Sequence, residues 1–274
     1  MNSLISIIIP TKNAEKDLLS LMRSLTRQKY KKFEVIINDD KSSPDGTATL
    51  IKNFQKNLRI TYIHRNRSMA QGRKEGAKIA KGSYQMHIDA DMMLDSNVLK
   101  ECMTVIKKND ALIIPEVSVG EGYWASVKSF ERSLYVGDET IESARFFRTD
   151  VYKKIGGHNE KIVFSEDKDI DLRIRKMGGK VGRIKAVIFH NEGKLSLFRD
   201  LRKKYHYGKT ASLYIKNHKS AATKQGNVLF RPAYFRNWKK IVRNPQLAGG
   251  MFIMKFLEFC AVCSGLVIEK ISIK

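Results

Sequence analysis

Residues 4–13 read LISIIIPTKN, and this stretch sets the expected fold. Residues 4–9 form a nearly continuous apolar run that ends at Pro10. A short run of this kind is typical of a strand buried on both faces, as in a parallel sheet. The polar segment 11–13 follows at once, so it is expected at the carboxyl end of the first strand.

The alternation of strand, loop and helix continues over about the first 115 residues. That alternation is the signature of a doubly wound α/β sheet. A later helix is expected to begin near Ser165 and to end at residues 178–179, before a strand-like stretch over 181–190. We expect strands at residues 4–9, 33–37, 60–63, 84–88 and 111–117, and helices at residues 14–28, 48–57, 69–80 and 97–107.

Basic residues outnumber acidic ones by 51 to 28 in this 274-residue chain, which gives a formal net charge of +23. Such a surface attracts polyanions, including nucleic acid, anionic lipid and phosphorylated substrates, without choosing among them. The excess is densest in residues 191–274, which hold 17 basic and 4 acidic residues. An apolar content of 42% excludes wholesale disorder, and three cysteines are too few for a disulfide framework.

Two pairs of carboxylates follow expected strands, at the edge where sheets of this class bind ligands. Asp89 and Asp91 flank Ala90 directly after the strand at 84–88. Residues two apart on an extended strand face the same side, so two such acids repel each other and favour a cation as their partner. Oxygen ligands suit Mg²⁺ or Mn²⁺. A solvated loop that binds nothing is the competing interpretation.

The second pair, Asp39 and Asp40, follows the strand at 33–37. A carboxylate in this place can accept hydrogen bonds from a base edge or a ribose hydroxyl. An ordinary turn aspartate would instead bond its own backbone.

Glu166 and Asp167 stand at the start of an expected helix. Either they only complement the helix dipole, or one of them acts as a general base on a substrate hydroxyl. His190 follows a short apolar run. A lone histidine is more often structural, but a strand-end histidine near two aspartates is a candidate metal ligand.

Residues 247–268 form the last apolar stretch, with Lys255 and Glu258 as its only charged residues. The stretch is long enough to span a membrane, but two charges in its middle are costly in hydrocarbon. The two charges are three residues apart and therefore share one helix face. We favour a helix that lies on an anionic membrane surface over one packed on the main domain or one that spans the bilayer.

Together these motifs resemble glycosyltransferase family 2, the inverting nucleotide-sugar glycosyltransferases of GT-A fold. The resemblance runs in order over residues 4–190. The segments that carry it are PTKN at 10–13, EVIINDDKSSPDGT at 34–47, RNRSMAQGRKEGAKIAKGSY at 65–84, DAD at 89–91, and GG at 156–157 followed by EDKDIDLR at 166–173.

The resemblance implies a catalytic domain in residues 1–190, built as a GT-A type doubly wound mixed sheet flanked by helices. Residues 191–274 would then be a basic, aromatic-rich helical extension that ends in the membrane-associating helix. The implied activity is that of a metal-dependent hexosyltransferase, which moves a sugar from a UDP- or GDP-sugar to a hydroxyl group.

The resemblance also implies the roles of individual residues. Asp167, with Glu166 beside it, would supply the catalytic base. Asp89, Asp91 and His190 would hold Mn²⁺ or Mg²⁺. The residues that would bind the nucleotide-sugar are Pro10, Thr11, Asn13, Asp39, Asp40, Arg73, Asp89 and Ala90.

The C-terminal region is similar to the tails of prokaryotic family members that act on lipid-linked glycans. We therefore expect a lipid-linked or other glycan acceptor, and a peripheral or monotopic protein at the cytoplasmic face of the cell membrane. Three departures from the family pattern stand out: Lys41, Lys74 and the pair 92–93, which reads Met-Met. The last argues against the polyprenyl-phosphate glycosyl transferases, which remain an alternative.

A nucleic-acid-binding protein is the alternative from a different class. It would explain the basic tail but not the ordered acids at the strand ends, so nucleic acid is not the expected partner. An inactive scaffold of the same fold is a second alternative. A nucleotidyltransferase would be expected to carry a glycine-rich loop after the first strand, and residues 11–13 do not form one.

Overall fold

The computed structural model describes residues 3–40, 46–65, 68–227 and 231–272. Lys41, Asn66 and Arg67, which belong to the motifs above, lie outside the described residues.

The chain divides into two compact units that are interleaved along the sequence. The first unit contains Met1–Glu116, Ser143–Glu160 and Ile170–Asn191, and the second contains Val117–Glu142, Lys161–Asp169 and Glu192–Lys274.

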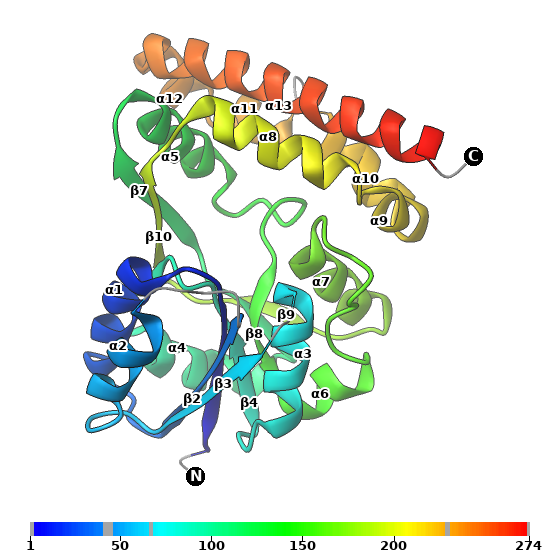
Figure 1. Cartoon of the computed structure of the whole chain (residues 1–274). Helices are drawn as coiled ribbons and strands as arrows, with labels where there is room; N and C mark the ends of the chain where they lie inside the picture. Colours follow the sequence, from blue (N-terminus) through cyan, green and yellow to red (C-terminus); the bar gives the residue numbers. More distant parts are fainter. Residues whose placement is uncertain (1–2, 41–45, 66–67, 228–230, 273–274) are drawn as a thin grey trace. The chain divides into compact units, whose positions relative to one another are not determined.

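A seven-stranded mixed sheet forms the centre of the first unit (Figure 1). Its strands lie in the order β3-β2-β1-β4-β8-β6-β9. The first four run parallel, whereas β8 is antiparallel to both of its neighbours, β4 and β6. The expected doubly wound α/β sheet is therefore confirmed. The strand bounds are Ile5–Thr11 (β1), Phe33–Asp40 (β2), Ile60–Arg65 (β3), Tyr84–His87 (β4), Ala111–Ile113 (β6), Ala144–Arg148 (β8) and Val181–Arg183 (β9).

Helices cover both faces of this sheet, as the apolar run of β1 predicts. Ile7 of β1 packs in one cluster with Leu18 of α1, and Ile8 packs in another with Ala77 of α3. A side chain at Gly76 would place its Cβ 2.7 Å from Ile8 Cγ2, so glycine lets α3 lie close to the sheet. The helices of the first unit are α1 (Glu15–Thr26), α2 (Thr47–Phe54), α3 (Met69–Ile79), α4 (Val98–Val105), the 3₁₀ turn Ile106–Lys108 and α6 (Thr149–Lys154).

Two expected strands are wrong in their extent. The stretch 111–117 is not one strand, because the chain breaks at Ile114 and Pro115 and then forms β7 (Glu116–Glu121). Proline has no N–H to continue a ladder. The stretch 181–190 likewise divides into β9 and β10 (Ile188–Lys194), and β10 pairs antiparallel with the short β5 (Met92–Leu94).

The second unit is mainly helical. Val127 and Leu134 of α5 share a core with Tyr234, Met251 and Met254. The alternation of strands and helices did not predict α5, because its chain segment lies beyond the repeating pattern. The helices of this unit are α5 (Tyr123–Tyr135), α8 (Leu197–Gly208), α9 (Ser212–Asn217), α10 (Lys219–Gly226), α11 (Pro232–Arg236), α12 (Trp238–Arg243) and α13 (Pro245–Ser272).

The helix α7 (Glu166–Lys176) begins in the second unit and continues into the first. It begins where the sequence predicts. Ser165, just before it, has a positive φ of 57° rather than the extended backbone that an N-cap residue usually adopts.

Candidate functional site

The carboxyl ends of β1 and β2 bring Thr11 and Asp39 together as partners in register. Thr11 Oγ1 donates to Asp39 Oδ1 at 2.8 Å, and Tyr62 OH donates to Oδ2 at 2.8 Å. Asp39 is only 2% exposed. Its neighbour Asp40 is less buried and pairs with Lys12, whose Nζ lies 3.1 Å from Oδ2. Asp39 is therefore buried and held in place at the carboxyl ends of β1 and β2, while Asp40 lies nearer to the surface.

Pro10 and Asn13 lie at the same strand end. A Cβ on Gly72 of α3 would lie 3.3 Å from Pro10 Cβ, and Asn38 Nδ2 donates to the Gly72 carbonyl at 3.0 Å. Asn13 has a positive φ of 50°, which asparagine tolerates better than most residues, where the chain turns from β1 towards α1. The glycine thus allows the part of α3 that carries Arg73 to approach the strand ends.

Asp89 is held by two arginines. Arg73, which is 3% exposed, pairs with Oδ1 of Asp89. Arg145 of β8 has its Nη1 3.7 Å from Oδ2 of the same carboxylate. Two largely buried guanidinium groups at the carboxyl ends of the strands are suited to an anionic ligand such as a phosphate.

Asp91 belongs to the same cluster through His190. Nε2 of His190 lies 3.3 Å from Asp91 Oδ2, and Nδ1 lies 3.4 Å from Glu116 Oε2. Glu116 in turn accepts a hydrogen bond from Arg145 Nε at 2.5 Å. A continuous chain of contacts therefore runs from Asp91 through His190, Glu116 and Arg145 to Asp89. We call these five residues the strand-end cluster.

The chemistry of this cluster fits a divalent cation at Asp91 and His190. The two ring nitrogens of His190 face different carboxylates, so Glu116 turns Nε2 towards Asp91. Metal-binding histidines commonly have a carboxylate behind the second ring nitrogen in this way. Within the described part of the chain, no three His, Cys, Asp or Glu side chains converge as a ready-made metal site. The carboxylate of Asp89 pairs with Arg73 and Arg145 and does not converge with Asp91 and His190 as a third metal ligand.

Asp17 of α1 borders the cluster and was not singled out from the sequence. Asn191 Nδ2 donates to its Oδ1 at 3.0 Å, and the backbone N–H of Asn191 donates to the Asp91 carbonyl. Burial raises the pKa of Asp17, and the nearby charge of Asp91 raises it further, against the hydrogen bond from Asn191. These contacts fix the loop that carries Asp91 to α1.

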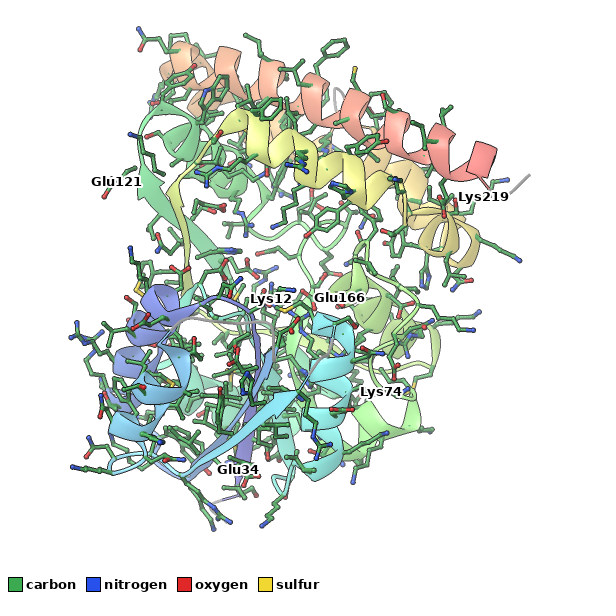
Figure 2. All side chains as sticks on the ribbon, in the orientation of Figure 1. Lys12, Glu34, Lys74, Glu121, Glu166 and Lys219 are labelled. Carbon is green, nitrogen blue, oxygen red and sulfur yellow. The ribbon has the colours of Figure 1, made fainter. Side chains whose placement is uncertain are left out.

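Glu166 and Asp167, the expected catalytic acids, begin α7 and belong to the second unit. Both side chains are partly exposed, whereas the next two residues are buried. Lys168 Nζ donates to the carbonyls of Glu139 and Glu142, the latter at 2.9 Å. The first turn of α7 is therefore anchored on the loop after α5, with Asp167 left accessible; Figure 2 labels Glu166 at this turn.

The aromatic ring of Phe164 and the carboxylate of Asp169 tie the same turn to the C-terminal region. Phe164 packs edge-on against Tyr214 at 5.6 Å between ring centroids. His218 Nε2 lies 2.7 Å from Asp169 Oδ1. These contacts explain why residues 161–169 belong to the second unit.

The sequence did not single out several residues of these arrangements, among them Glu116, Arg145 and His218. Glu116 follows an apolar run, as the other acids at strand ends do, and this position could have identified it as a candidate site residue. Arg145 lies on a strand outside the repeating pattern, and His218 lies in the tail. No local signal connects either one with its partner.

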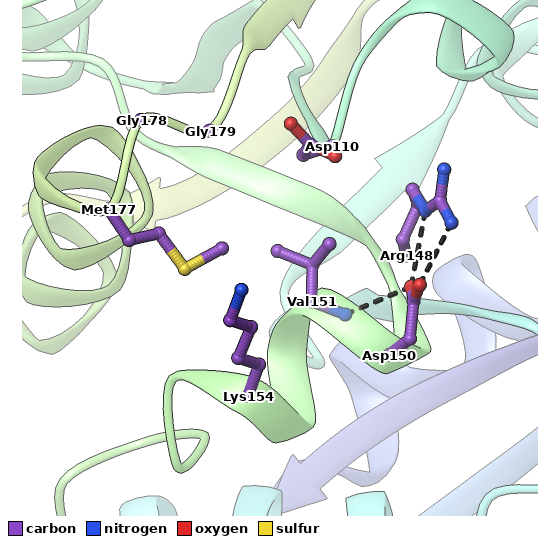
Figure 3. Close-up of a pocket in the computed structure, with 8 residues that line it drawn as sticks. All are labelled: Asp110, Arg148, Asp150, Val151, Lys154, Met177, Gly178 and Gly179. Carbon is purple, nitrogen blue, oxygen red and sulfur yellow. Dashed lines mark hydrogen bonds and ion pairs between the residues drawn. The ribbon is translucent and has the colours of Figure 1, made fainter.

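The pocket drawn in Figure 3 is separate from the strand-end cluster. It has a volume of about 360 Å³ and is lined in part by Arg148, Asp150 and Lys154. Arg148 is paired in register with Tyr84, the first residue of β4. This pocket therefore lies at the end of the sheet opposite to the strand-end cluster, and its Arg148–Asp150 ion pair has exposed side chains.

Comparison with known proteins places the chain in a family. A model of glycosyl transferase family 2 matches residues 6–161, which is more than half of the chain. The poly(ribitol-phosphate) β-N-acetylglucosaminyltransferase TarS of Staphylococcus aureus is 30% identical over 116 residues, which cover 40% of this chain and 20% of TarS. The chain spans only 20% to 38% of the length of the first curated relatives it matches.

Solved structures agree on the fold. The mannosyltransferase PcManGT of Pyrobaculum calidifontis, in complex with GDP-Man and Mn²⁺, superposes with a TM-score of 0.68 at 15% identity, over 97% of this chain and 87% of that chain. TarS 1–349 of S. aureus superposes with a TM-score of 0.58 at 17% identity, over 98% and 91% of the two chains. With the family match over residues 6–161, these likenesses confirm the GT-A type fold, and the chain belongs to glycosyltransferase family 2.

Proposed function

We propose that this protein is a metal-dependent inverting glycosyltransferase that moves a sugar from a UDP- or GDP-sugar to a hydroxyl group of a glycan acceptor. The strand-end cluster carries the proposal. It joins three carboxylates, one arginine and a histidine at the edge where sheets of this class bind ligands, and Arg73 pairs with its Asp89. In addition, TarS 1–349 has been crystallised with UDP-GlcNAc, and PcManGT with GDP-Man and Mn²⁺.

The donor would bind across the strand ends. Asp39, held rigid by Thr11 and Tyr62, would accept hydrogen bonds from the base or the ribose. The guanidinium groups of Arg73 and Arg145 would lie near the diphosphate, where their charge is complementary.

Asp91 and His190 would hold the divalent cation, with Asp89 close by. When bound, this cation would offset the negative charge that develops on the departing nucleoside diphosphate. Glu116 would keep the His190 ring in its orientation through the second ring nitrogen.

Asp167 would be the general base. It would take the proton from the acceptor hydroxyl, whose oxygen attacks the anomeric carbon while the bond from that carbon to the phosphate oxygen breaks. The attack from the opposite face inverts the anomeric configuration. The partial exposure of Asp167 on an anchored helical turn is suited to this role, because the base must be both accessible and fixed.

The acceptor we favour is a lipid-linked glycan at the cytoplasmic face of the cell membrane. The basic C-terminal region supports this choice, because it would attract a diphosphate-linked acceptor and an anionic surface. A polyprenyl phosphate is the second candidate. Its phosphate is already ionised, so Asp167→Asn would then leave turnover intact.

The first experiment is a thermal-shift panel of UDP-, GDP- and dTDP-sugars, each with Mn²⁺, Mg²⁺ or EDTA. A ligand that binds only the folded state stabilises it by about 2.7 kcal/mol at a hundredfold excess over its dissociation constant. We expect one nucleotide class to shift the melting temperature, and only with metal. Asp91→Asn should abolish this shift and turnover, whereas Asp150→Asn, whose exposed carboxylate lies at the opposite end of the sheet, should abolish neither.

Release of nucleoside diphosphate in the presence of acceptor lipid extract completes the test. Asp167→Asn should lower this release at least a hundredfold while leaving the donor-induced shift unchanged. The absence of any donor shift with either metal would overturn the proposed function.

A further inference from the structure

The helix α13 has two faces of opposite character. One face turns inward, and the residues on it are spaced three, four or seven apart: Ala248, Met251, Lys255, Glu258 and Gly265 are all buried. The opposite face follows the same spacing and is exposed: Ile253, Phe256, Cys260, Cys263 and Val267. We call this second set the outer face of α13.

The outer face is apolar throughout. Ile253, Phe256 and Val267 are 57%, 56% and 55% exposed, and Phe259 beside them is 42% exposed. Within the described residues, Pro245–Glu269 is the one helical segment that is long and apolar enough to cross a membrane, and 28% of its most apolar window is buried. A continuous apolar surface of this kind on a folded protein indicates a contact with lipid or with another protein.

The two charged residues in the middle of α13, Lys255 and Glu258, do not interrupt this surface, because both turn inward. Lys255 Nζ lies 2.8 Å from Glu131 Oε1 and 2.6 Å from Glu258 Oε2. Lys128 Nζ completes a closed ring, 3.2 Å from Glu131 Oε2 and 3.1 Å from Glu258 Oε1. Each carboxylate oxygen of this ion ring therefore has an ammonium group beside it, and Lys204 Nζ of α8 also lies 4.0 Å from Glu258 Oε1. The ring joins α13 to α5.

The packing of the buried face of α13 against α8 also argues against a helix that spans the membrane. Backbone atoms of α8 and α13 meet at Gly208 and Gly265, where an added Cβ on Gly265 would lie 3.0 Å from Gly208 Cα. Figure 1 shows α8 running alongside α13 over much of its length. Moving α13 across a bilayer would either open the ion ring or carry α8 into hydrocarbon, together with the exposed Arg202 and Lys203.

Exposed aromatic and basic residues lie on the short helices that lead into α13. Phe235, Trp238 and Val242 are 68%, 57% and 66% exposed. Exposed basic residues alternate with them at Arg236, Lys239, Lys240 and Arg243. Tryptophan and basic residues beside an apolar face are the composition of segments that lie in the headgroup region of anionic membranes. A second copy of the chain would bring these like charges together, so the charge favours lipid.

We infer that the second unit docks on an anionic bilayer, with the outer face of α13 buried at the level of the upper acyl chains and with α11 and α12 in the headgroup layer. The helix lies in the membrane plane and does not span it. This inference deepens the proposed function and rests on it for one point, that the acceptor is lipid-linked. Docking itself requires neither the donor nor catalysis.

The cysteines of the chain provide the test. Cys260 and Cys263 are exposed on the outer face, and Cys102 is buried in the first unit. The full chain is treated with a charged, membrane-impermeant maleimide, alone, with phosphatidylcholine vesicles, and with vesicles containing 30% phosphatidylglycerol. Labelling at each cysteine is followed by mass spectrometry.

We expect the anionic vesicles to slow labelling of Cys260 and Cys263 at least tenfold, and neutral vesicles to slow it less. Cys102 should stay unlabelled throughout. Phe256→Ser with Val267→Ser should lower vesicle flotation at least tenfold, whereas Ile79→Ser, which changes a 43% exposed side chain on α3, should not. Raising the salt to 0.5 M should weaken flotation, because it screens the headgroup attraction.

Three outcomes would overturn the inference. Unchanged labelling with anionic vesicles means that the outer face does not meet lipid. Protection that rises with protein concentration in the absence of vesicles means that a second copy covers the face. Labelling of the single variants Gln246→Cys and Ile268→Cys, whose positions lie near the two ends of the apolar helix, from opposite sides of a sealed bilayer means that the helix spans. The metal-dependent donor shift, measured on the same protein, reports separately on the proposed function.

Discussion

His218 Nε2 lies 2.7 Å from Asp169 Oδ1 and so joins the junction of α9 and α10 to the first turn of α7. Asp169 is 2% exposed and follows the proposed base, Asp167, by two residues. The C-terminal region therefore does more than extend the fold. It forms part of the support on which the proposed base is held.

His218→Ala should lower kcat by about ten- to a hundredfold, because small displacements of a catalytic group carry penalties of that size. The donor-induced thermal shift and the KM for the donor should not change, since the proposed donor-binding residues do not include His218. His218→Gln, which keeps a hydrogen-bond donor, should recover part of the rate. His206→Ala on the exposed side of α8 is the matched control, and an equal loss of kcat in that variant would speak against positioning by His218.

Glu116→Gln should weaken Mn²⁺ binding by about ten- to a hundredfold, the usual effect of removing a carboxylate behind a metal-binding histidine. The measurement is a Mn²⁺ titration followed by electron paramagnetic resonance, which needs no turnover. Glu121→Gln, at the exposed far end of the same strand, is the control. If Glu116→Gln binds Mn²⁺ with wild-type affinity, Glu116 does not support the metal-binding histidine.

Two glycine substitutions in α13 should change stability in opposite directions. A Cβ at Gly265 would lie 2.1 Å from the Tyr205 carbonyl oxygen, so Gly265→Ala should separate α8 from α13 at a cost of about 1–3 kcal/mol. Gly249 has nothing within 4 Å of such a Cβ, so Gly249→Ala should stabilise the helix by up to about 1 kcal/mol.

The measurement for this pair is urea unfolding followed by tryptophan fluorescence. Both tryptophans, Trp124 and Trp238, lie in the second unit and report on it directly. Changes of the same sign in the two variants would contradict the close packing of α8 on α13.

The ion ring should make the second unit sensitive to acid. Burial alone would raise the pKa of Glu131, but the charges of Lys128 and Lys255 outweigh it and hold the pKa at about 2, below the ordinary value of 4.5. Because the pKa of Glu131 is lower in the folded protein than in the unfolded chain, the ionised carboxylate stabilises the fold at pH values above the unfolded pKa of 4.5. That stabilisation should therefore be present above pH 4.5 and should be lost progressively as the pH falls towards 2.

Urea midpoints at pH 7, 4.5 and 3 would measure this loss. Lys128→Met leaves two buried carboxylates with one ammonium fewer, and should cost about 3–5 kcal/mol at pH 7. Lys100→Met, on the exposed side of α4, should change the midpoint little. A midpoint that does not vary with pH would mean that the ring does not stabilise the fold in solution.

The sequence determined the features that depend on neighbouring residues. The apolar run before Pro10 predicted β1, and the acids after the strands predicted where Asp39, Asp89 and Asp91 would stand. The spacing of Lys255 and Glu258 placed both on one face of α13. These features depend on the spacing of side chains along one strand or helix and on the residues that end it, so the local sequence is enough to predict them.

Tertiary structure decided what depends on residues far apart in the chain. It connected Glu116 with His190 and Arg145, and Asp169 with His218, through contacts of 29 to 74 positions in separation. It also decided that the charged face of α13 turns inward, because Lys128 and Glu131 of α5 neutralise it there. Charge balance and close packing between distant segments have no local period, and only the folded chain brings the partners together.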